Sequence, residues 1–179
     1  MNTDAYANLP IAQLGHPILR QTAQVIVDIG SIKTQELISQ LIVRVKSAGG
    51  VGIAAPQIFM SERAFIVCSK PTARYPDAPD MPATAMINPQ LLTHGKTIEK
   101  AWEGCLSVPS LRGLVPRYTD ISISYFDLQG EKHYQQLTGF IARVFQHELD
   151  HLNGITFVDR VELTEDLMSE QEWYRQFVN

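Results

Sequence analysis

The chain has 179 residues, of which 45% are hydrophobic and 19% are charged, and its formal net charge is −4. At about 150 residues per domain, this length predicts one domain, 1–179, with enough residues for a hydrophobic core. The acidic balance argues against a nucleic-acid-binding protein, which needs a strongly basic face to contact phosphates. An anionic membrane surface is not an expected partner either.

Apolar runs and cysteines indicate the cellular compartment. The first fifteen residues lack a basic cluster and an apolar run of signal-peptide length, and no run of eighteen apolar residues occurs anywhere. Cys68 and Cys105 could form one disulfide at most, and a chain of this length does not need one. We therefore expect a cytoplasmic protein and consider its cysteines as candidates for chemistry.

The first half of the chain predicts a helix followed by a strand. Apolar residues recur at helical spacing over 34–48, and Gly49 and Gly50 end that helix. A short apolar run over 64–68 predicts a buried strand. Four prolines make 70–82 an exposed loop.

The second half predicts several strands and then two more helices. Strands are expected over 85–87, 91–94, 98–102, 121–126 and 132–137, with a hairpin turn at 129–130. A helix over 139–152 ends at 153–154, and a last helix over 164–177 has Thr164 as its N-cap. Because the strands cluster between helices, we expect an α+β protein with mostly antiparallel sheets packed around a central helix.

The strongest chemical signal lies on that central helix, in His147-Glu148-Leu149-Asp150-His151. Histidines four residues apart share a helical face and can hold one metal ion, with Glu148 facing a water molecule beside it. The alternative is an exposed helical turn with scattered polar residues. Apolar residues around the motif favour a buried helix: Ile141, Val144, Phe145, Leu149 and Leu152.

A catalytic metal needs a third protein ligand and an open position. The metzincin pattern is excluded, because Phe157 stands where its third histidine belongs. A gluzincin-like site would take a glutamate from the last helix: Glu165, Glu170 or Glu172. A Cys-His-His site would take Cys105 instead, although a lone cysteine is more often a small buried hydrophobe, which is how we interpret Cys68.

The segment Gly50-Val51-Gly52-Ile53-Ala54-Ala55 fits the loose dinucleotide-binding fingerprint. That fingerprint must follow a strand and open a helix, whereas this segment follows a helix and leads into Pro56 and a strand. Its glycines instead permit the close approach of another backbone, and Gln57 is the polar side chain that remains to be explained.

Three segments together, 50–57, 103–107 and 146–151, resemble the signature motifs of the peptide deformylases in order and spacing. The resemblance extends to Ile87-Asn88-Pro89 and to 112–117. Ile53 stands where the family more often has leucine, and Arg143 where many bacterial members have an aliphatic residue. The resemblance implies a hydrolase that removes the formyl group from the N-terminal formyl-methionine of new proteins and releases formate.

The resemblance also implies roles for single residues. Cys105, His147 and His151 would hold one divalent metal ion per chain, in this family iron(II), for which zinc, nickel or cobalt could substitute. Glu148 would act as general base and then as general acid, and the Gln57 amide and the Leu106 N–H would stabilise the oxyanion. The remaining implied site residues would contact substrate or support the site: Val51, Gly52, Glu103, Arg112, Phe140 and Val144.

Two other functions stay open. One is a zinc peptidase that uses His147, His151 and a C-terminal glutamate, and the other is a protein whose metal only stabilises the fold. Glu148 argues against the second, because a structural site has no use for a carboxylate beside an open position. The expected partners are nascent formyl-methionyl polypeptides and, transiently, the ribosome, although 162–179 carries five acidic residues against one arginine.

Overall fold

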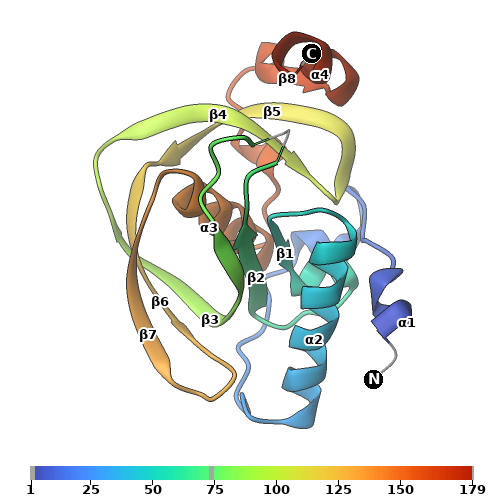
Figure 1. The fold of residues 1–179 in the computed structure, drawn as a ribbon, viewed down its shortest axis with the longest axis vertical. Helices are drawn as coiled ribbons and strands as arrows, with labels where there is room; N and C mark the ends of the chain where they lie inside the picture. Colours follow the sequence, from blue (N-terminus) through green and yellow to red (C-terminus); the bar gives the residue numbers. More distant parts are fainter. Residues whose placement is uncertain (1–2, 73–74, 179) are drawn as a thin grey trace.

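Two antiparallel sheets surround a central helix in the structure, a computed structural model that describes residues 3–72 and 75–178 (Figure 1). The first sheet has the strand order β1-β2-β3-β6-β7, and the second has the order β4-β5-β8. All pairings between these strands are antiparallel. The structure confirms the α+β class.

The helices are α1 (Thr3–Ala7), α2 (Ile32–Ser47), α3 (Gly139–Leu152) and α4 (Glu170–Phe177). The strands of the first sheet are β1 (Gly52–Ala54), β2 (Ala64–Ser69), β3 (Met81–His94), β6 (Asp120–Phe126) and β7 (Lys132–Thr138). Those of the second are β4 (Ile98–Cys105), β5 (Val108–Tyr118) and β8 (Leu167–Ser169). Within the described residues, no helix is long and apolar enough to span a membrane.

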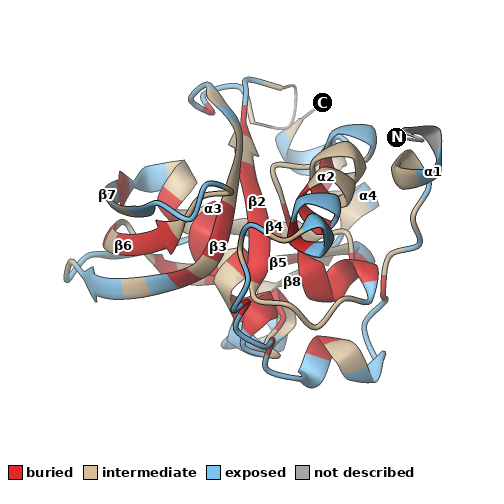
Figure 2. Cartoon of the chain, turned by 90° about the horizontal axis from the view of Figure 1, so that it is seen from below, coloured by how far each residue is buried: buried red, intermediate tan, exposed pale blue. Residues whose placement is uncertain are grey.

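Strand β2 shows why the core has two halves. Its side chains alternate between the sheet faces, so Phe65 and Val67 join the cluster around α3 while Ile66 joins the cluster around α2. The Phe65 ring meets the Phe145 ring of α3 edge to face, with 5.3 Å between centroids. The buried residues in Figure 2 accordingly run along β2, α3 and the inner face of α2. This packing fixes α3 against the sheet.

Helix α3 has the predicted boundaries, and α2 begins two residues before the predicted start because Ser31 caps it by accepting from the Thr34 N–H. The two strands predicted over 85–87 and 91–94 form one long strand, β3. Between them the register shifts at Asn88, whose φ is 50°. The Asn88 side chain bonds both the N–H and the carbonyl of Ile26, which stabilises this irregularity.

The predicted last helix over 164–177 is wrong in its first half. Residues Thr164–Asp166 form a 3-10 turn, and Leu167–Ser169 form β8 along the edge of β5. Helix α4 starts only at Glu170, where Ser169 accepts from the Glu172 N–H as the N-cap. Pairing with an exposed strand edge has overridden the local helical pattern.

Candidate active site

A cleft lies between β1, the hairpin of β4 and β5, and α3, and residues from all the predicted motifs line it. Cys105 ends β4, Gln57 belongs to the 3-10 turn η2 (Ala55–Ile58), and His147 and Glu148 lie on α3. Gln146 fixes α3 against β5, because its amide bonds both the N–H and the carbonyl of Tyr118. Segments far apart in sequence thus meet at one place.

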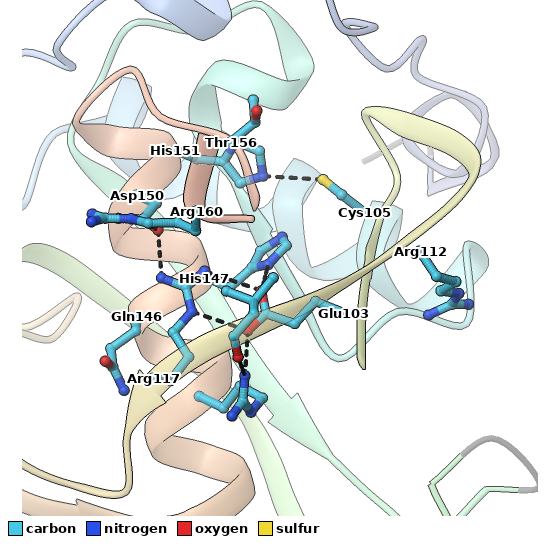
Figure 3. A network of polar contacts seen from close by, with 12 residues as sticks. Glu103, Cys105, Arg112, Arg117, Gln146, His147, Asp150, His151, Thr156 and Arg160 are labelled. Atoms are coloured by element: carbon cyan, nitrogen blue, oxygen red, sulfur yellow. Dashed lines mark hydrogen bonds and ion pairs between the residues drawn. The ribbon is translucent and has the colours of Figure 1, made fainter. Parts of the chain in front are cut away.

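Cys105, His147 and His151 form the predicted cluster. Cys105 Sγ lies 3.1 Å from His151 Nε2, and one ligand atom from each of the three residues lies within 4.8 Å of the others. Figure 3 shows Cys105 and His151 directed toward each other. Burial would raise the pKa of the Cys105 thiol, but the charges and hydrogen bonds of His151 and His147 hold it well below its usual value. A thiolate is the form that binds a cation.

This donor set fits a divalent metal. One thiolate and two imidazoles suit zinc and iron, and three ligands leave a fourth position open for water or substrate. None of the three glutamates of the gluzincin alternative belongs to the group of close ligand atoms around His147 and His151. Glu170 pairs with Arg112, Glu172 pairs with Arg175, and Glu165 is exposed. Among the described residues, the other group close enough to share an ion is Asp127, Glu131 and His133 in the β6–β7 hairpin.

Glu103 lies behind the cluster in a buried network of charges (Figure 3). Its Oε2 is 2.9 Å from His147 Nδ1, and its carboxylate accepts from Arg117 Nε and Nη2, both at 3.0 Å, and from Arg143 Nη1 at 2.9 Å. Burial opposes ionisation, but His147 and Arg117 lower the pKa of Glu103 well below its usual range. Glu103 therefore stays ionised and orients the ring of His147.

The network continues beyond the residues that the sequence singled out. Arg117 Nη1 donates to Asp150 at 2.5 Å, and Arg160 donates to the same carboxylate at 3.1 and 2.7 Å. Asp150 lies within the histidine motif and was assigned no role. The sequence could have predicted a role for Asp150, because an aspartate that shares a buried helix with apolar neighbours needs a cationic partner.

Glu148 is 4% exposed, and its Oε2 has no hydrogen-bond partner among the described residues. Burial raises the pKa of Glu148 to about 7. Its carboxylate lies against Gly52, where a Cβ would come within 2.8 Å of Glu148 Cδ. Glycine at position 52 therefore leaves space for the Glu148 side chain. From the sequence we expected it to permit the close approach of another backbone.

Gln57 is 2% exposed and held in one orientation. Its Oε1 accepts from the Ala54 N–H at 2.8 Å, so Nε2 is directed toward the hairpin and lies 3.2 Å from Ser107 Oγ and 3.4 Å from Cys105 Sγ. Leu106 lines the same cleft between these residues. The structure thus brings an amide donor next to the three-residue cluster.

Val51, Phe140 and Val144 form an apolar part of the cleft, as expected for a side-chain pocket. Arg112 also lines the cleft but is not a surface arginine, being 2% exposed. Arg143 reaches the cleft as well, where it bonds Glu103 and the carbonyls of Val115 and Glu99. Its charge is therefore satisfied within the wall.

Comparison with known proteins identifies the family. The profile of the polypeptide deformylase family matches residues 8–166. Peptide deformylase 2 of Nostoc sp. is 52% identical over 165 residues, covering 92% of each chain, and peptide deformylase 2 of Shewanella oneidensis is 44% identical over 164 residues, covering 92% of this chain and 90% of that protein.

Solved structures agree with these sequence matches. The Met-Ala-Ser-bound class I type b peptide deformylase of Acinetobacter baumannii has a TM-score of 0.83 at 43% identity, covering 86% of this chain and 98% of that one. The Synechococcus elongatus peptide deformylase in complex with actinonin has a TM-score of 0.79 at 33% identity, covering 89% and 82%. On the family profile, the identity and the shared fold, this chain belongs to the peptide deformylase family.

Proposed function

We propose that the cleft carries out the known reaction of this family, the removal of the formyl group from N-formyl-methionine peptides, through Cys105, His147, His151, Glu148 and Gln57. The observation that carries this assignment is the position of an unpaired buried carboxylate, Glu148, beside a Cys-His-His cluster in an open cleft. A peptidase with a glutamate ligand is disfavoured, because Glu165, Glu170 and Glu172 all lie outside the group of ligand atoms that Cys105 forms with the two histidines.

Cys105, His147 and His151 are the proposed ligands of one divalent metal ion. When bound, such an ion lowers the pKa of a water molecule to near neutral and polarises a carbonyl oxygen. Iron(II) is the proposed resident ion, and zinc, nickel or cobalt suits the same donors. Glu103 holds His147 through Nδ1, which leaves Nε2 for the ion.

The substrate is proposed to lie along β1, the edge strand of its sheet, with the methionine side chain between Val51, Phe140 and Val144. An edge strand has one side available for pairing with an extended peptide. The binding of Met-Ala-Ser by the Acinetobacter baumannii relative supports a peptide that begins with methionine. Arg112 is proposed to lie beside the residues that follow the methionine.

Glu148 is proposed to move the proton. Its carboxylate takes a proton from the attacking water and gives it to the amine that leaves, so the same residue acts first as base and then as acid. Its buried position, which raises its pKa to about 7, suits both tasks near neutral pH.

The oxyanion that forms on the formyl oxygen is proposed to accept from Gln57 Nε2 and the Leu106 N–H. Because Gln57 Oε1 accepts from the Ala54 N–H, the amide is held with Nε2 beside Cys105 Sγ and Ser107 Oγ, next to the proposed metal ligands. Donors fixed before the reaction stabilise developing charge most effectively.

We place this activity on nascent polypeptides in the cytoplasm, with transient ribosome contact, because formyl-methionine is the start of a newly made chain. The test is formate release from formyl-Met-Ala-Ser-amide, with acetyl-Met-Ala-Ser-amide and an internal peptide as comparison substrates. Glu148→Gln should keep its metal and lose turnover by several orders of magnitude, whereas Glu165→Gln, an exposed glutamate, should match the wild type. Cleavage of internal bonds without formate would contradict the assignment.

A further inference from the structure

Helix α4 brings an acidic side chain to the outer end of the cleft. Glu170, its first residue, accepts from Arg112 Nη2, and both residues line the cleft. Strand β8 fixes this position, because Met168 pairs with Arg112 in the antiparallel register of β8 and β5. The carboxylate therefore belongs to the wall of the cleft, although it comes from the end of the chain.

The two charges of this pair face solvent unequally. The Arg112 side chain is 3% exposed, whereas the Glu170 side chain is 35% exposed. Two aromatic side chains cover the guanidinium: the Trp173 ring centroid lies 4.9 Å from its Cζ, and the Tyr75 hydroxyl lies 3.5 Å from its Nη1. Gly104 packs so closely against it that a Cβ there would overlap the guanidinium. A ligand that enters the cleft from outside therefore meets the carboxylate before the cation.

The deeper charges of the cleft are neutralised separately. Glu103 pairs with Arg117 and Arg143 in the network behind the histidines, and Arg112 lies apart from this network in Figure 3. The outer end thus has its own charge pattern, set by Glu170 over Arg112.

We propose that Glu170 determines substrate preference by charge, so that formyl-methionyl chains with Lys or Arg in the residues after methionine are favoured over those with Asp or Glu. This inference rests on the proposed function, since it assumes that the peptide leaves the methionine pocket past Arg112. Opposite charges attract across a solvent-facing rim, and like charges repel there. Because the Glu170 carboxylate is partly exposed and paired with Arg112, the effect is modest and is screened by salt.

The test uses capped formyl-tripeptide amides with lysine, serine or glutamate at the second or the third residue, so that the side chain supplies the variable charge. Formate release gives kcat/KM for each. In the wild type we expect lysine to exceed glutamate by about 5-fold at low salt, a ratio that falls as salt is added. Glu170→Gln, which keeps an oxygen for Arg112, should bring the ratio close to one, and Glu170→Lys should invert it.

Glu172→Gln is the matched control, because Glu172 lies on the same helix and pairs with Arg175 away from the cleft. It should keep the wild-type ratio, and thermal unfolding should show that all variants are folded. An unchanged ratio in Glu170→Gln overturns the proposal, and so does an equal rise for all peptides, which would mean that Glu170 competes with substrate for Arg112. A wild type that releases no formate from any peptide contradicts the proposed function instead.

Discussion

Glu103 Oε2 lies 2.9 Å from His147 Nδ1, so a carboxylate from β4 determines which nitrogen of a histidine on α3 faces the cleft. A histidine that donates from Nδ1 has its Nε2 lone pair available for a metal ion. Arg117 and Arg143 hold this carboxylate from the other side. The ligand is thus oriented by a network that spans β4, β5 and α3.

We predict that Glu103→Gln weakens metal binding by about 10- to 100-fold, because the amide holds His147 less firmly. The affinity is measured by chelator competition with cobalt, whose absorption spectrum also reports the ligand geometry. Loss of the buried ion pair should lower the free energy of unfolding by about 3 kcal/mol. Glu99→Gln, an exposed glutamate of the same strand, serves as the control, and equal metal affinity in the two variants would refute the role of Glu103.

Gly52→Ala should impair turnover while leaving the metal content unchanged. A Cβ at Gly52 would lie within 2.8 Å of Glu148 Cδ, so the carboxylate must move. Displacement of a reacting group by about 1 Å can reduce the rate about 100-fold. The matched control is Gly95→Ala, where the new Cβ lies 3.4 Å from Asp120 Cβ, an ordinary contact. Full turnover in Gly52→Ala would show that Glu148 does not need its observed position.

The sequence predicted those elements whose pattern is local. Helix α3 has its apolar stripe and strand β2 its apolar run, and both appear where expected. Strand β5 was missed, because Pro109, Gly113 and Pro116 make its sequence unlike a strand, and it forms by pairing with β4 and β8. Strand β8 was missed because its local sequence fits a helix, and its strand conformation depends on pairing with the edge of β5.

In the candidate site too, local spacing could be predicted from the sequence, whereas contacts between distant segments could not. The histidine motif predicted the positions of His147, Glu148 and His151 relative to one another, since helical spacing fixes them. The partners of Glu103 could not be predicted, because Arg117 and Arg143 reach it from β5 and α3. The burial of Arg112 likewise depends on Trp173 and Glu170, which arrive from the end of the chain.

Gln57→Ala should lower kcat by about 100- to 1,000-fold, the usual cost of removing one oxyanion donor, while KM changes little. Gln57→Glu is a stricter test, because the carboxylate keeps an acceptor for the Ala54 N–H but replaces the amide NH2 group that would donate to the oxyanion. Both variants should be inactive to a similar degree. Gln35→Ala, an exposed glutamine of α2, is the control. If Gln57→Glu retains wild-type kcat, the donor role is wrong.

The two cysteines provide an internal comparison for the role of Cys105. A ligand thiolate is bound to the metal and protected, whereas a nucleophilic thiolate must be free to form a covalent intermediate. Burial raises the pKa of the Cys68 thiol, so Cys68 should react slowly with an alkylating agent under all conditions. Any change in alkylation on removal of the metal can therefore be assigned to Cys105.

We predict that metal-loaded protein resists alkylation at Cys105 and that a chelator exposes this thiol and abolishes activity together, as followed by mass spectrometry of the labelled peptides. Cys105→Ser should lose both the metal and turnover, because a hydroxyl is a poor substitute for a thiolate ligand. Cys68→Ser should retain both. If iron is the resident ion, exposure to air should inactivate the enzyme by oxidising the iron or the thiolate. Replacement of iron by nickel should remove the part of this inactivation that depends on oxidation of iron. Full activity in metal-free protein, or a formyl-thioester trapped on Cys105, would show that this cysteine is a nucleophile and not a ligand.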